Sequence, residues 1–104
     1  MKLLTKELIK KLPKYGITEN IKADDKILHV KLFCPWSNWT WYLVEYGEAD
    51  GYCFGYVEGF ENEWGCFSLP ELEAIKGPFG LKIERDLYFK PIRFGDLAKN
   101  ECLL

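Results

Sequence analysis

Residues 39–59 read WTWYLVEYGEADGYCFGYVEG and predict two strands joined by a tight turn. Aromatic and β-branched residues, which favour strands, dominate both halves. Between them, GEADG at 47–51 is typical of a hairpin connection. Because side chains alternate along a strand, the two faces of the first strand should differ. We expect Trp39, Trp41, Leu43 and Glu45 on one face and Thr40, Tyr42, Val44 and Tyr46 on the other.

Further strands are expected on both sides of this hairpin. Residues 26–34, KILHVKLFC, alternate and predict one half-buried strand with Leu28, Val30, Leu32 and Cys34 on a single face. Gly55, inside the strand at 52–59, indicates either a large neighbour, such as a tryptophan, or a β-bulge. The segment 60–63 should be a loop that leads to a short strand at 64–68. Residues 81–89 are expected to be extended and to form the last strand.

Two short helices complete the predicted fold. Thr5 can cap the first, which Pro13 ends, and Leu4 with Ile9 forms a hydrophobic staple. The second is expected to begin with the capping box of Ser68 and Glu71 and the staple of Phe67 and Leu72, and to stop at Gly77 and Pro78. Residues 94–100 could add one helical turn. The order of elements predicts a single α+β domain, residues 1–104, with an antiparallel meander sheet of four to five strands and two short helices.

The centre of the chain is acidic and aromatic. Residues 32–75 contain no lysine or arginine but hold all four tryptophans. Clustered cations, which phosphate binding needs, are missing from this stretch, so nucleic-acid binding is not expected. A basic protein partner suits it better. The carboxylates of this stretch are Glu45, Glu48, Asp50, Glu58, Glu61, Glu63, Glu71 and Glu73.

No catalytic, cofactor or metal motif stands out. Alternation places His29, the only histidine, on the opposite strand face from Cys34, which argues against a nucleophilic pair. No C-x-x-C pair exists, so Cys34, Cys53, Cys66 and Cys102 are expected to be reduced apolar side chains of a cytoplasmic protein. No apolar run approaches the length of a leader core or a membrane span. We therefore expect no enzyme, no metal, no cofactor and no membrane contact.

The surface expected to bind a partner is centred on residues 60–64. A loop with two acids cannot bury them cheaply, so it should lie at the surface. Glu45, Glu48, Asp50 and Glu58, on or beside the neighbouring hairpin, could extend its negative charge. The predicted contact residues are Trp36, Trp39, Trp41, Glu58, Glu61, Glu63 and Trp64.

Two other readings of the same residues stay open. Trp36, Trp39, Trp41, Tyr52, Phe54 and Tyr56 could stack nucleobases in a single-strand binder. That function would require Lys6, Lys10, Lys82, Arg85 and Arg93 to converge on the aromatic face. A small enzyme is the third possibility, with Glu58, Glu61 and Glu63 as acid–base or divalent-cation ligands.

Several separated blocks resemble a known family: KLLTKEL at 2–8, SNWTWY at 37–42, FGYVEG at 54–59, FSLPELE at 67–73 and GLKIERDLYF at 80–89. The chain is similar to the bacterial domain-of-unknown-function family 2958. Members of that family are encoded largely on plasmids, conjugative elements and phages. The resemblance carries over no catalytic or cofactor residue. It implies a setting in which proteins block host restriction or CRISPR nucleases, or assist DNA transfer and replication.

Overall fold

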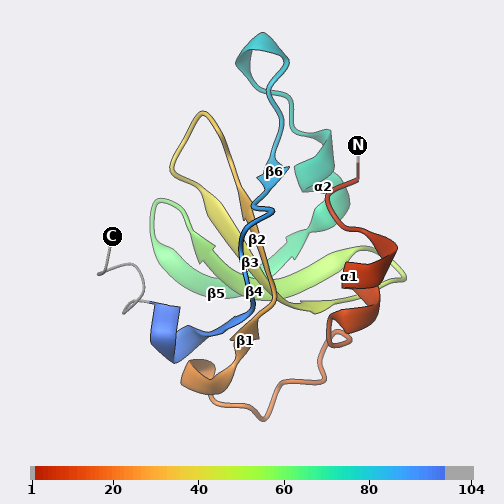
Figure 1. Cartoon of the computed structure of the whole chain (residues 1–104), viewed down its shortest axis with the longest axis vertical. Coiled ribbons are helices and arrows are strands. Elements are labelled where there is room, and N and C mark those ends of the chain that lie inside the picture. Colours follow the sequence, from red (N-terminus) through yellow and green to blue (C-terminus); the bar gives the residue numbers. More distant parts are fainter. Residues whose placement is uncertain (1, 98–104) are drawn as a thin grey trace.

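The computed structural model describes residues 2–97, which fold as an α+β structure around an antiparallel sheet (Figure 1). This confirms the predicted fold class. Residues 94–97 are also helical, and the expected remainder of that turn, 98–100, lies outside the described residues. No helix among residues 2–97 is both long enough and apolar enough to cross a membrane. The elements are α1 (Lys6–Lys11), η1 (Ala23–Asp25), β1 (Ile27–Leu28), β2 (Val30–Phe33), β3 (Thr40–Tyr46), β4 (Tyr52–Glu58), β5 (Asn62–Ser68), α2 (Leu69–Ala74), η2 (Pro78–Gly80), β6 (Glu84–Arg85) and β7 (Ile92–Arg93).

The main sheet has five strands in the order β5-β4-β3-β2-β6. Strands β2 to β5 form the predicted meander, and every pair is antiparallel. The expected last strand at 81–89 shortens to Glu84 and Arg85, which pair with Phe33 and Leu32. A separate two-stranded sheet joins β1 to β7. The edge strands β5 and β6 thus lie on opposite sides of the sheet.

The two helices cover one face of the sheet. Thr5 caps α1 by accepting a hydrogen bond from the Leu8 amide, as predicted. Leu4 and Leu12 of this region pack with Leu69 and Leu72 of the α2 region into the larger core cluster. From the sheet, that cluster takes Val30, Leu32, Trp41, Leu43 and Cys53.

The C-terminal segment covers the other face. A second cluster contains Leu28, Tyr42, Val44 and Leu97, and Phe54, Tyr56, Trp64, Phe89, Ile92 and Phe94 pack against it. The result is three layers, with the helices on one side of the sheet and residues 89–97 on the other (Figure 1).

A β-bulge corrects the predicted alternation in β3. The register passes from Leu43↔Gly55 directly to Glu45↔Phe54, so Val44 is the extra residue. Tyr46 therefore shares the Leu43 face, and Glu45 moves to the opposite one. Gly55 is required here because a Cβ would come within 1.8 Å of the Tyr42 carbonyl oxygen. The bulge interpretation of this glycine is confirmed.

The predicted single strand at 26–34 is also wrong. It breaks at His29 into β1 and β2. Leu28 then belongs to the cluster beneath the C-terminal segment, whereas Val30 and Leu32 belong to the cluster beneath the helices. The break lets β1 leave the main sheet and pair with β7.

Helix α2 begins where the sequence predicts and ends earlier. The Ser68 hydroxyl accepts a hydrogen bond from the Glu71 amide at 3.3 Å. The helix ends at Ala74, because Ile75 already has an extended backbone, and Gly77 has a different role. A Cβ at Gly77 would come within 2.5 Å of the Trp36 ring. Strand β5 starts at Asn62, so the expected loop at 60–63 is shorter than predicted.

Candidate functional site

The turn between β4 and β5 presents an aromatic ring among carboxylates. Its backbone closes through a hydrogen bond from the Gly59 amide to the Glu61 carbonyl oxygen, at 3.1 Å. This tight reversal leaves Phe60 at its tip with 95% of its surface exposed. Glu61 and Glu63 on either side of Asn62 are exposed as well. We call Phe60, Glu61 and Glu63 the acidic turn.

Trp39, the residue just before β3, contacts this turn. A Cβ at Gly59 would lie 2.5 Å from the Trp39 ring, so only glycine lets the ring sit there. Phe60 meets Trp39 edge-on, with ring centroids 5.5 Å apart and planes at 84°. Trp39 in turn stacks on Trp41 at 5.9 Å. Phe60 thus touches a ring that packs against the core, while almost all of its own surface stays exposed.

Glu58 and Glu63 lie on different faces beside the turn. The half-buried Glu58 accepts a hydrogen bond from the Tyr42 hydroxyl at 3.5 Å. Glu63 pairs with Val57, so it projects on the helix-covered face, the face to which Trp39 packs. The acids most available to a partner are therefore Glu61 and Glu63.

The other three predicted tryptophans do not join this surface. Trp36 packs over Gly77, at the segment that follows α2. Trp41 is a core residue with 8% of its surface exposed, which places it out of a partner's reach. Trp64 stacks on Phe54 at 5.8 Å and meets Phe94 at 4.7 Å, beneath the C-terminal segment. Of the predicted contact residues, Trp39, Glu61 and Glu63 lie together beside Phe60, whereas Glu58 lies on the other face.

The expected extension of the acidic surface along the hairpin is wrong for Glu45, Glu48 and Asp50. Glu45 is buried, with 3% exposed, and accepts hydrogen bonds from the Gly16 amide (2.6 Å), the Thr18 amide (2.8 Å) and the Thr18 hydroxyl. Glu48 and Asp50 lie in the β3–β4 turn, at the far end of the strands from the acidic turn (Figure 1). Seven-residue strands separate those ends by about 20 Å.

The buried Glu45 is a structural group that the sequence did not reveal. Burial raises its pKa, but the hydrogen bonds from Thr18 and Gly16 and the charge of Lys26 outweigh burial and lower the pKa below its usual value. Lys26 is also buried, and its ammonium donates to the Thr18 carbonyl oxygen at 2.6 Å. The network fixes the 16–18 loop against β3.

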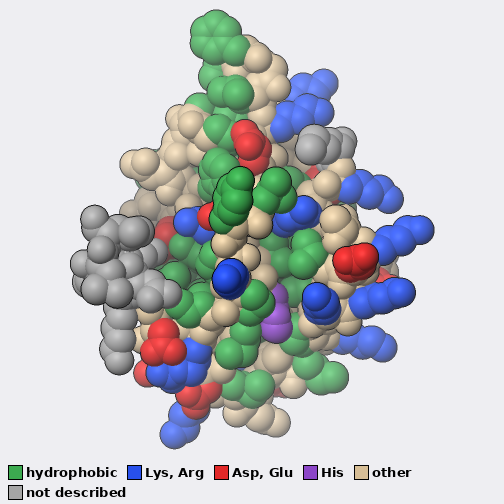
Figure 2. All heavy atoms as spheres, viewed as in Figure 1, with side chains coloured by type: hydrophobic (Ala, Val, Ile, Leu, Met, Phe, Trp, Pro, Cys, Tyr) green, Lys and Arg blue, Asp and Glu red, His purple; other side chains and the backbone are tan. Residues whose placement is uncertain are grey.

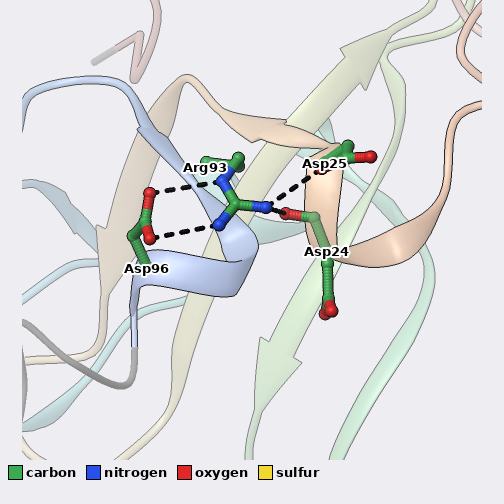
Figure 3. A network of polar contacts seen from close by, with 4 residues as sticks. All are labelled: Asp24, Asp25, Arg93 and Asp96. Atoms are coloured by element: carbon green, nitrogen blue, oxygen red, sulfur yellow. Dashed lines mark hydrogen bonds and ion pairs between the residues drawn. The ribbon is translucent and has the colours of Figure 1, made fainter.

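Arg93, one of the cations that the single-strand interpretation requires, is held by aspartates. Arg93 bonds Asp25 at 3.0 Å, Asp96 at 3.2 Å and the Asp24 carbonyl oxygen at 3.2 Å (Figure 3). Asp96 and Asp25 raise its pKa. The aromatic face itself is covered, since Phe94 lies 4.7 Å from the Tyr56 ring. Of the proposed base-stacking rings, Tyr52 is the exposed one, at 47%.

The residues with nucleophilic or metal-binding chemistry are dispersed. Burial lowers the pKa of His29 and raises that of Cys53 to about 12. Cys34 is buried too, whereas Cys66 is exposed and has its sulfur 2.9 Å from the Tyr15 hydroxyl oxygen. Among residues 2–97, no group of three or more His, Cys, Asp or Glu side chains could hold a metal ion.

A pocket that the sequence did not indicate lies beside β6. Its volume is about 390 Å³, and its apolar lining comes from Leu3, Leu81, Ile83 and Leu87. Lys2, Lys82 and Arg85 also line it. We call it the β6 pocket. The segment expected to form a strand at 81–89 supplies most of this lining, although only Glu84 and Arg85 of it are paired as a strand.

An exposed apolar arm, with Phe79, Leu87 and Tyr88 as its most exposed residues, adjoins this pocket. At its tip, Phe79 is fully exposed and holds the rare backbone angle φ 56°, between Pro78 and Gly80. Leu87 is 73% exposed and Tyr88 92%. Figure 2 shows hydrophobic side chains running from the projecting tip down this face, with lysine and arginine side chains beside them.

Residues 3–95 match the family described as "Protein of unknown function (DUF2958)". The match spans most of the chain, so the protein belongs to this family, as the resemblance indicated. No curated protein and no solved structure matches the chain.

Proposed function

We propose that the chain is a non-enzymatic binding protein that engages a basic protein partner through the acidic turn. The observation that carries the proposal is the position of Phe60. Its ring is 95% exposed, is held by Trp39 and lies beside exposed Glu61 and Glu63. Aromatic side chains are enriched at interface centres and charged residues at their rim, so an exposed aromatic beside two acids suits such a surface.

The sign of the charge selects the partner class. Residues 32–75, which include the acidic turn and Trp39, contain no lysine or arginine. Enzymes that process nucleic acids carry basic channels, and an acidic surface is complementary to them. We propose a host DNA-processing or defence nuclease as the partner, with the chain acting as an inhibitor or modulator of the anti-restriction or anti-CRISPR type. The mobile-element setting implied by the family resemblance is consistent with that role.

The alternative of a single-strand nucleic-acid binder has weaker support. Its proposed aromatic sheet face lies under Phe94 and the other residues of the C-terminal segment. Arg93, one of the cations it would use, is already bonded to aspartates. The acidic turn would repel phosphates.

The test is capture of basic nucleases from a bacterial lysate with the variant Glu61→Lys/Glu63→Lys. Both side chains are exposed, so the variant should fold, as circular dichroism would show. We expect it to lose partner capture, and we expect a steep salt dependence for the wild-type complex.

The matched control is Glu19→Lys/Glu48→Lys. It changes the net charge by the same amount at exposed positions at the other end of the sheet, where Thr18 contacts Glu45. Capture should survive in this variant. If the acidic-turn variant folds and still retains every partner, the proposed surface is wrong. If both variants lose capture equally, net charge rather than this turn governs binding.

A further inference from the structure

We propose that the β6 pocket receives the acidic turn of a second copy of the chain, so that copies associate head to tail. This contact goes beyond the proposed function, because it assigns a second binding site and a second ligand for the turn.

The pocket has the chemistry to bind an aromatic ring flanked by carboxylates. Its lining of Leu3, Leu81, Ile83 and Leu87 is apolar, and its volume of about 390 Å³ lies in the range of about 300–1,000 Å³ that ligand pockets span. Burial of a ring there would remove apolar surface of both partners from water. The same contact would cover part of Leu87, which is 73% exposed.

The pocket lining has a small excess of positive charge. It contains three cations, Lys2, Lys82 and Arg85, and two acids, Glu73 and Glu84. Glu73 already accepts a hydrogen bond from the Leu3 amide at 2.7 Å. Lys82 is exposed and is therefore the cation that can approach an incoming carboxylate most freely. The pocket thus favours a ligand with negative charge beside its ring.

The acidic turn matches these requirements residue by residue. Phe60 supplies the ring, and the exposed Glu61 and Glu63, which follow it in the chain, supply carboxylates beside it. The edge contact between Phe60 and Trp39 holds the ring outward before binding. A ring that is already positioned loses less freedom on insertion.

The topology makes the contact intermolecular. The acidic turn leads into β5, one edge of the main sheet, whereas the pocket adjoins β6, the opposite edge. Within one chain, the Phe60 ring and the β6 pocket therefore lie at different edges of the sheet, so the ring cannot enter the pocket of its own chain. Such a heterologous contact leaves one unused site at each end, so it extends into open chains or closes into rings. A copy bound through its turn could not bind a nuclease through the same turn.

Two complementary variants test the contact. The turn variant is Phe60→Ser/Glu61→Lys, and the pocket variant is Lys82→Glu/Leu87→Glu; all four positions are exposed, so both should fold. Sedimentation velocity and light scattering would follow mass up to about 1 mM protein, the weak end of the affinity scale. We expect the wild-type mass to rise with concentration and to fall with salt. Each variant alone should associate at least about tenfold more weakly.

An equimolar mixture of the two variants is the decisive sample. The pocket variant keeps an intact turn and the turn variant keeps an intact pocket, so the mixture should form pairs of chains and nothing larger. A wild-type protein that stays monomeric at about 1 mM overturns the proposal, as does an assembly that either variant retains or a mixture that fails to pair. The pocket variant separates this contact from nuclease binding, since its capture of a basic partner should persist even where self-association is lost.

Discussion

The Trp39 ring lies so close to Gly59 that a Cβ on that glycine would come within 2.5 Å of the ring carbons. Trp39 also holds Phe60 by an edge contact. The glycine therefore determines both the packing of the tryptophan and the position of the exposed ring. This relationship links the stability of the turn to its proposed function.

We predict that Gly59→Ala will destabilise the protein. The added methyl must push the ring away or shift the turn, and overpacking of this kind costs about 1–3 kcal/mol of unfolding free energy. Urea denaturation followed by tryptophan fluorescence measures the loss. Gly65→Ala is the matched control, because nothing lies within 4 Å of its Cβ position. Equal effects of the two substitutions would contradict the ring contact.

The cap of α2 gives a second prediction. The Ser68 hydroxyl accepts a hydrogen bond from the Glu71 amide, which otherwise would have no partner in the first turn of the helix. Ser68→Ala should lower the unfolding free energy by about 0.5–2 kcal/mol. Ser68→Asp, which keeps an acceptor at this position, should recover most of the loss. An unchanged urea midpoint for the alanine variant would show that the cap contributes nothing.

The features predicted correctly from the sequence are mainly local. The caps at Thr5 and Ser68 and the β3–β4 hairpin depend on residues within a few positions of one another. Gly55 indicated the bulge because a glycine weakens the interior of a strand, and it therefore often marks a bulge or the close approach of another group. The alternation errors at Val44 and His29 have another origin, since no local pattern reveals where a strand gains a residue or leaves the sheet.

The candidate site was also predicted only in part, because local patterns reveal some of its features and distant contacts decide the others. Exposure of Glu61 and Glu63 follows from the cost of burying charge in a turn. The burial of Trp64 depends on Phe94, thirty positions along the chain. Alternation indicates which side chains share a face, but it does not say which face a distant segment covers. Glu45 was misplaced similarly, because its partners, Gly16 and Thr18, lie in a loop far along the sequence.

Glu45 should make stability depend on pH. Its pKa in the folded protein lies below the usual value of 4.5, so the unfolded chain binds the proton more readily. The stabilisation is therefore present above about pH 4.5 and is lost as the pH falls through the lower folded pKa. Glu45→Gln should lose about 1–3 kcal/mol near neutral pH and show a flatter acid slope. Urea melts from pH 3 to 7 measure both, with Glu19→Gln as the exposed control; an unchanged slope for Glu45→Gln would refute the assignment.

The thiols should differ in reactivity. In Cys102→Ser protein at pH 8, brief alkylation should modify Cys66, which is exposed, and spare Cys34 and Cys53, which are buried. Burial raises the pKa of Cys53 to about 12, so little reactive thiolate forms there. Mass spectrometry identifies the modified sites. Denatured, unreduced wild-type protein should expose four thiols, and a count of two or none would reveal disulfides.

The last prediction concerns nucleic acid. The acidic turn repels phosphates, the aromatic sheet face lies under Phe94, and Arg93 is held by Asp25 and Asp96. We expect no submicromolar binding of single- or double-stranded DNA at about 0.15 M salt, measured by fluorescence anisotropy with labelled oligonucleotides. Residual weak binding at low salt should come from the cations of the β6 pocket and should decrease in Lys82→Glu. Tight binding by the wild-type protein, strengthened further in the variant Glu61→Lys/Glu63→Lys, would instead support the single-strand function. Such a gain would mean that the bound phosphates lie close to the acidic turn.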